Sequence, residues 1–185
     1  MKIRVVPYPL LAISAMLLSG LTLLAENSDS AKITELLRQA KEHAVNANLN
    51  AEQIEVYTRS HAGWETHARQ LNIMTTNVND LGKDVAKLTA AREEGSPWQQ
   101  ESINNINPLL RSMAGNLSAT IKHLNANKDR VHLQMYQDYA MMNSKLSQQM
   151  LTTINDYLHY AEAKANAASL EQKLQLSPQS RPDEQ

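Results

Sequence analysis

The chain has 185 residues, contains no cysteine and no phenylalanine, and carries a formal net charge of −1 at pH 7. The absence of cysteine excludes disulfide bonds, thiolate metal sites, cysteine nucleophiles and covalent haem attachment. The near balance of 18 basic and 19 acidic residues provides no strongly basic face for binding nucleic acid.

The first 25 residues have the layout of a secretory signal peptide. Lys2 and Arg4 supply positive charge without an acid, and an apolar run of about 16 residues follows from Leu10 to Ala25. This run is shorter than the roughly 20 residues that span a bilayer as a helix. The pattern predicts export to the periplasm or the extracellular space, with cleavage after Ala25. The alternative is an uncleaved N-terminal helix that anchors the protein in a membrane.

Residues 26–30 form a short polar lead, and residues 31–174 are predicted to be one helical domain. Few glycines and prolines, together with abundant alanine and leucine, favour long helices. Apolar and small side chains recur at alternating steps of three and four residues, the period of a helix face packed on other helices. Four such stripes predict helices at about 31–60, 63–92, 97–125 and 129–174. The simplest packing is an all-α, antiparallel up-down-up-down four-helix bundle.

The breaks between the stripes have local causes. A one-residue shift of the stripe near Gly63 predicts a turn there, and a continuous helix through Gly63 is the competing interpretation. Ser96 and Gln99 match a capping box, and Pro97 suits the first turn of the helix that follows. Residues 125–129 are rich in turn and cap residues and predict the third turn.

The fourth helix is predicted to be the longest and to extend past the bundle. Its segment from Ala161 to Leu174 carries a weaker continuation of the stripe and is the candidate surface for a protein partner or for self-association. A frayed, solvated helix end is the alternative. Residues 175–185 are predicted to be a disordered tail. The predicted core-facing positions of the fourth helix are His132, Met135, Tyr139, Met142, Leu146, Met150, Thr153, Tyr157 and Tyr160.

Four of the six histidines fall near one end of the predicted bundle. An antiparallel arrangement brings together the end of the first helix, the start of the second, the end of the third and the start of the fourth. Neutral imidazoles are good ligands for zinc and copper, so this His-rich end is a candidate metal site. Histidines that are solvated or capped and never converge are the alternative. The candidate metal ligands are His61, His67, His123 and His132.

Motifs of known enzymes are missing from the sequence. It contains no Gly-rich phosphate loop, no Gly-x-Ser-x-Gly elbow and no His-Glu-x-x-His. Methionines on the predicted core faces are interpreted as core filler in a chain without phenylalanine. The sequence therefore predicts no catalysis and no cofactor, and it favours an exported binding or structural module of the cell envelope. The alternative is a small metal-binding bundle that holds zinc or copper at its His-rich end.

Overall fold

The computed structural model describes residues 28–60 and 62–176, and within these ranges the protein is all-helical, without strands. The all-α class predicted from the sequence is therefore confirmed. Two short 3-10 turns, η1 (Arg92–Glu94) and η2 (Lys128–Arg130), lie between the last three helices. The helices are α1 (Ala31–Thr58), α2 (Trp64–Ala90), α3 (Pro97–Ala126) and α4 (Gln134–Leu176).

The predictions for the two chain ends concern segments mostly outside the described residues. The signal peptide predicted for residues 1–25 lies wholly outside them, and so does most of the predicted tail. The exception is residues 175–176, which are the last residues of α4 and thus helical. None of the described helices is both long enough and apolar enough to cross a membrane.

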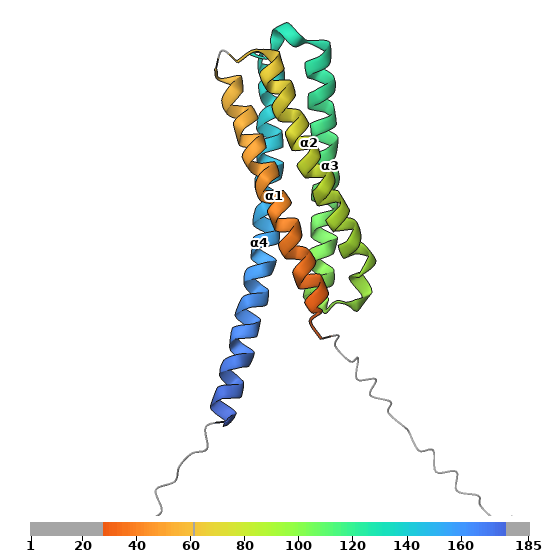
Figure 1. Ribbon diagram of the computed structural model, residues 1–185, viewed down its shortest axis with the longest axis vertical. Helices are drawn as coiled ribbons and strands as arrows, with labels where there is room; N and C mark the ends of the chain where they lie inside the picture. Colours follow the sequence, from red (N-terminus) through yellow and green to blue (C-terminus); the bar gives the residue numbers. More distant parts are fainter. Residues whose placement is uncertain (1–27, 61, 177–185) are drawn as a thin grey trace, which may run out of the picture.

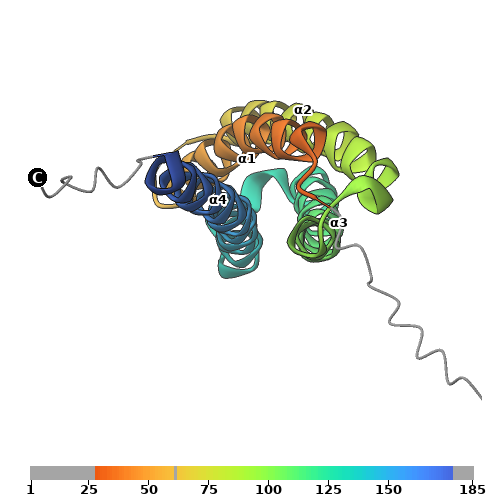
Figure 2. The ribbon, with the colours of Figure 1, turned by 90° about the horizontal axis from the view of Figure 1, so that it is seen from below.

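The four helices pack side by side as a helical bundle (Figure 1). Both α1 and α3 contact α2 and α4, and successive helices run in opposite directions along the long axis. In the view from below, α1 and α2 form one side of the bundle, with α3 and α4 beneath them (Figure 2). We call the end where α1 finishes and α4 begins the upper end, and the end where α1 begins the lower end. α4 continues past the lower ends of the other helices.

The stripes predicted for the first three helices face the core. Four alanines on α1 allow its neighbours to approach closely, and each large apolar side chain buried contributes about 1.5–3 kcal/mol. The predicted stripes also include Trp64 on α2 and Leu110 on α3, and these two side chains are only partly buried. The buried positions are Ile33, Leu37, Ala40, Ala44, Ala47, Ala51, Ile54 and Thr58 on α1; His67, Leu71, Met74, Val78, Leu81, Val85 and Leu88 on α2; and Ile103, Ile106, Met113, Leu117, Thr120 and Leu124 on α3.

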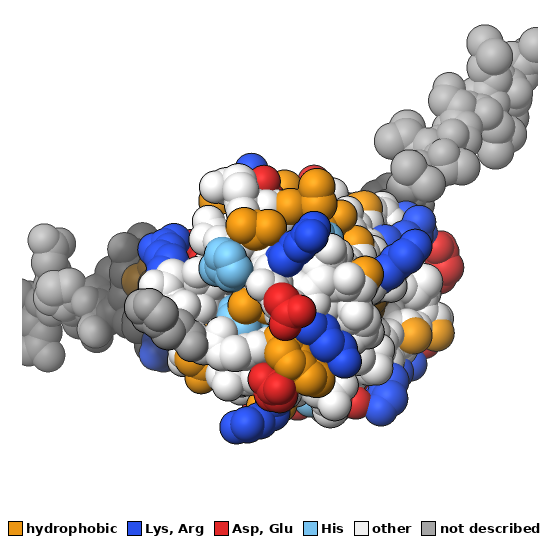
Figure 3. All heavy atoms as spheres, turned by 90° about the horizontal axis from the view of Figure 1, so that it is seen from above, with side chains coloured by type: hydrophobic (Ala, Val, Ile, Leu, Met, Phe, Trp, Pro, Cys, Tyr) orange, Lys and Arg blue, Asp and Glu red, His pale blue; other side chains and the backbone are white. Residues whose placement is uncertain are grey.

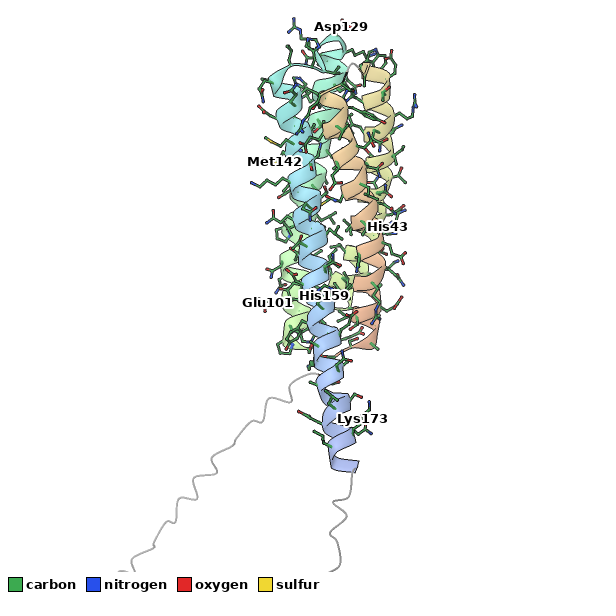
Figure 4. All side chains as sticks on the ribbon, turned by 90° about the vertical axis from the view of Figure 1, so that its left-hand side faces the viewer. His43, Glu101, Asp129, Met142, His159 and Lys173 are labelled. Atoms are coloured by element: carbon green, nitrogen blue, oxygen red, sulfur yellow. The ribbon has the colours of Figure 1, made fainter. Side chains whose placement is uncertain are left out.

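The core face predicted for α4 is wrong. Met135 and Met142 are 61% and 42% exposed, and His132 and Tyr160 are exposed as well. Met142 lies on the outer side of α4 in Figure 4. The helix is rotated so that a neighbouring stripe enters the core, and Met150 is the only predicted position that is buried. The buried positions are Tyr136, Ala140, Asn143, Ser147, Met150, Ile154 and Leu158.

Hydrogen bonds to α1 and α3 explain why this more polar face is the buried one. Asn143 Nδ2 donates to Thr120 Oγ1 at 2.9 Å, and Asn143 Oδ1 accepts from Asn116 Nδ2 at 2.8 Å. On the other side, Ser147 Oγ donates to Asn48 Oδ1 at 3.1 Å. A buried polar group without such a partner is destabilising, so these bonds fix the rotation of α4 about its axis.

Candidate functional site

Tyrosine and histidine side chains from all four helices meet at the upper end and form what we call the upper aromatic cluster. His67 of α2 is fully buried between Tyr57 of α1 and Tyr136 of α4. The ring centroids of these tyrosines lie 5.9 and 5.1 Å from the imidazole, in edge-to-face geometry. His123 of α3 packs on Tyr136 and Tyr139 at 6.2 and 5.4 Å. The cluster closes the core at this end.

The His67 imidazole has one polar partner in the cluster. Its Nδ1 lies 3.1 Å from the Tyr136 hydroxyl, whereas its Nε2 is buried without a hydrogen-bond partner among the described residues. Burial lowers the pKa of His67 below its ordinary 6.5 and raises the pKa of Tyr136, because burial disfavours the charged form of each group. Both side chains are therefore neutral at pH 7.

The neutral, buried state of His67 predicts a loss of stability in mild acid. The unfolded chain binds a proton at this residue near pH 6.5, and the folded chain binds it only at lower pH. Between these two values the unfolded state holds more protons, so the free energy of unfolding falls with falling pH by at most about 1.4 kcal/mol per unit. Urea unfolding of wild type and His67→Gln from about pH 8 to 5 gives the free energy of unfolding of each protein at each pH. The difference between the two slopes of this free energy against pH is the contribution of His67.

His132→Gln is the matched control for this pH dependence, because His132 is exposed on the same end of the bundle. We expect it to keep the wild-type slope. Identical slopes for wild type and His67→Gln would show that His67 is not the group responsible.

The four histidines of the predicted metal site have different surroundings. His67 is buried, His123 is half-buried against tyrosine rings, and His132 is exposed, whereas His61 lies outside the described residues. In the part of the chain that the structure describes, no three His, Asp or Glu side chains are grouped so that they could hold a metal ion. The four-histidine metal site stays a prediction.

An open groove of about 630 Å³ lies beside the upper aromatic cluster, between the end of α1 and the start of α4. The upper end carries charges of both signs, dispersed among polar and hydrophobic side chains (Figure 3). Among the residues that line the groove, Arg59 is the one Lys, Arg, Asp or Glu side chain, and it pairs with Glu55 of α1. The lining residues of the groove are Tyr57, Thr58, Arg59, Ser60, Ala62, Val131, His132 and Gln137.

A second cluster, the lower aromatic cluster, closes the opposite end around Trp98. Tyr157 and Tyr160 of α4 pack on the Trp98 ring with centroids 6.4 and 5.4 Å away. Trp98 Nε1 and Lys164 Nζ donate to the same oxygen of Asp29, at 2.7 and 2.9 Å. Burial by itself would raise the pKa of Asp29. The hydrogen bonds to its carboxylate and the positive charge of Lys164 lower the pKa by more, so it lies below the ordinary 3.8. Asp29 is thus a carboxylate that links the start of the described chain to α3 and α4.

Gln99 ties the chain that enters α1 to the start of α3. Its Nε2 donates to the Ser30 carbonyl oxygen at 2.9 Å and to Thr34 Oγ1 at 3.1 Å. Its Oε1 accepts from the backbone N–H groups of Ser30 and Ser96, at 2.8 and 3.1 Å. The side chain is fully buried, and both ends of its amide are used. The capping-box pattern identified Gln99 in the sequence, but the bonds to Ser30, 69 positions away, depend on the fold.

Sequence reasoning missed a buried carboxylate between α1 and α2. Asp84 is 5% exposed; its Oδ1 accepts from Lys87 Nζ at 2.8 Å, and its Oδ2 lies 3.6 Å from His43 Nε2. The spacing of Asp84 and Lys87 on one helix is a detectable signal, whereas the approach of His43 depends on how α1 packs. The group links two helices of the bundle.

The last part of α4, residues 161–176, projects from the lower end, and we call it the α4 extension (Figure 1). Every side chain from Glu162 to Leu174 is exposed. Leu170 and Leu174 are 59% and 76% exposed. Lys173 marks the position of the extension in Figure 4. The stripe predicted to be a partner surface is therefore accessible.

Comparison of the chain with known protein families, with curated proteins and with solved structures found no match. The side chains of the two aromatic clusters pack against one another at the two ends of the bundle. The α4 extension differs from them, because it leaves apolar side chains in water on a helix that has left the bundle.

Proposed function

We propose that the chain is an exported module of the cell envelope, an up-down-up-down bundle that binds a protein partner or a second copy of itself through the α4 extension. It acts by binding and not by catalysis. The observation that carries the proposal is the exposed stripe of Ala163, Ala167, Leu170 and Leu174 on a projecting helix. Covering a leucine side chain contributes about 1.5–3 kcal/mol, so a partner on this stripe is favoured.

Export is supported by the charge and apolar pattern of residues 1–25. The start of α1 and the α4 extension lie at the same end of the bundle (Figure 1). A retained N-terminal anchor would therefore hold the extension close to the membrane, whereas cleavage would release the module into the periplasm or the extracellular space. N-terminal sequencing of protein from the envelope fraction distinguishes the two, with Glu26 as the expected first residue after cleavage.

The role of the extension is tested by adding charge to one face of it. In the full-length chain, Leu170→Glu with Leu174→Glu places two carboxylates on the stripe. Ala165→Glu with Gln172→Glu places the same charge on the opposite face of the same segment. Cross-linking in the producing cells should give a linked species with wild type and with the second pair, and none with the first. Equal cross-linking of all three proteins would reject the extension as the binding surface.

A small metal-binding bundle is the second candidate function. It is favoured by the buried His67 Nε2 without a partner, at the end that also holds His123 and His132. Imidazole nitrogens of this kind bind zinc and copper. Protein purified from the envelope without chelators should then carry a stoichiometric metal that raises the melting temperature. A metal-free protein whose melting temperature is unchanged by added zinc or copper would reject this function.

A further inference from the structure

The α4 extension has a heptad pattern in which two small residues are followed by two large ones. Its stripe advances by steps of four, three and four, which assigns Ala167 and Leu174 to a positions and Ala163 and Leu170 to d positions. We infer that two copies of this chain pair through their extensions as an antiparallel coiled coil, with Leu170 of one copy against Ala167 of the other. The inference rests on the proposed function, because it names the partner of the same surface.

Packing favours the antiparallel direction over the parallel one. In the antiparallel pair, Ala163 faces Leu174 of the second copy and Ala167 faces Leu170, so every layer holds one large and one small side chain. A parallel pair would set alanine against alanine in the first two layers and leucine against leucine in the last two. Protein interfaces pack as densely as interiors, and layers of equal volume let two straight helices keep one separation along their length.

The charges beside the stripe favour the same arrangement. Lys164 and Glu171 occupy e positions, and in the antiparallel pair each Lys164 lies beside Glu171 of the other copy. A parallel pair would bring Lys164 beside His159 and Glu171 beside Asn166, without an opposite charge in either contact. Lys164 is 49% exposed and already donates to Asp29 at 2.9 Å, but an ammonium group has three donors and can serve a second carboxylate.

The length of the extension selects one register. Residues 161–176 span about 24 Å at 1.5 Å per residue. In the inferred register, residue 161 of one copy lies beside residue 176 of the other, so the overlap uses the whole extension and ends where the other bundle begins. A shift by one heptad in either direction would place Lys164 beside Lys164 or Glu171 beside Glu171. Charge and length therefore agree on a single pairing.

The absence of native cysteine makes disulfide cross-linking a direct test of this pairing. Two full-length variants, Ala167→Cys and Leu170→Cys, are prepared, one of them with a size tag, and are oxidised alone and mixed. The antiparallel pair predicts that the mixture forms the linked heterodimer at least about tenfold faster than either variant forms a linked homodimer, since only positions 167 and 170 face each other. Ala165→Cys, on the outer face of the same segment, should give only background linkage in every combination.

Each other outcome overturns a defined part of the inference. Preferred linkage of Ala167→Cys to itself would show a parallel pair. A single-chain mass at all concentrations in sedimentation, with no linkage, would exclude a second copy as the partner. In that case a linked foreign protein in the cellular experiment above would still support the proposed function, so the two failures are distinguishable.

Charge reversal gives a second readout in solution. Lys164→Glu should raise the dissociation constant of the dimer by about tenfold, because the dimer contains two copies of the contact. Adding Glu171→Lys should return it to near the wild-type value, although the bond from residue 164 to Asp29 stays lost. A double variant as weak as Lys164→Glu alone would overturn the Lys164–Glu171 contact and with it the register.

Discussion

Replacing Gln99 with alanine should lower the free energy of unfolding by about 3 kcal/mol. The substitution removes five hydrogen bonds of a fully buried amide, including a 3.4 Å bond from Ser96 Oγ to Gln99 Oε1. It leaves the Ser30 and Ser96 N–H groups without their partner. It also removes the link that Gln99 makes between the start of α3 and the start of α1 through Ser30 and Thr34. Urea unfolding followed by circular dichroism measures the loss.

The neighbouring residue provides a matched control for this result. Gln100 is half-buried, and its Nε2 donates to the Gly95 carbonyl oxygen at 3.0 Å. Gln100→Ala should therefore cost no more than about 1 kcal/mol. Hydrogen exchange gives a local test, because the Ser30 amide should lose protection in Gln99→Ala and keep it in Gln100→Ala. Equal destabilisation by the two substitutions would mean that Gln99 is not the link between the helix starts.

Replacing Tyr136 with alanine should have a still larger effect, a loss of about 4 kcal/mol. Tyr136 is a large, fully buried side chain, and its ring contacts both His67 and His123. Truncation leaves a cavity at the upper end of the core and removes the partner of His67 Nδ1. Thermal and urea unfolding of the purified variant check the size of the loss.

Two further substitutions separate the ring of Tyr136 from its hydroxyl. Tyr136→Phe keeps the ring and should cost about 1–2 kcal/mol, because it leaves a buried imidazole nitrogen without its hydrogen bond. Tyr160→Ala, at a tyrosine on the same helix that is 51% exposed, should cost less than Tyr136→Ala. A loss for Tyr136→Phe as large as that for Tyr136→Ala would place the effect in the hydroxyl and not in the packing of the ring.

The core faces of α1, α2 and α3 could be predicted because their buried positions are nearly all apolar or small. On α1, for example, steps from Ile33 through Leu37 and Ala40 follow the helical period without a competing stripe. The breaks between helices were also visible, because Ser96 and Gln99 form a capping box that acts within a few residues of the chain.

The core face of α4 could not be predicted from hydrophobicity. The stripe through Met135 and Met142 is more apolar than the one through Asn143 and Ser147, yet the second is buried. What decides between them is the set of hydrogen-bond partners on α1 and α3, and a periodic pattern within one helix carries no information about those partners.

The end of the bundle at which the candidate site lies could be predicted from the sequence, but the contacts of its side chains could not. Helix order brings His67 and His123 to one end of the bundle, as expected. Their surroundings depend on the rotation of α4, which puts Tyr136 beside both imidazoles. The Asp29 and Gln99 contacts at the lower end join residues far apart in the chain, so the sequence shows the side chains without showing that they meet.

The rotation of α4 also decides which sulfur atoms meet water. Oxidation converts a methionine thioether to a polar sulfoxide, and accessible thioethers react before buried ones. Among the methionines that the structure describes, Met135, Met141 and Met142 are 61%, 54% and 42% exposed, whereas Met74, Met113 and Met150 are buried. An oxidant therefore meets the outer face of α4 first, where the change in polarity leaves the packed interior intact. Since the chain has no thiols, the exposed methionines of this face are the sulfur groups that an oxidant modifies first, and the packing of the core does not depend on them.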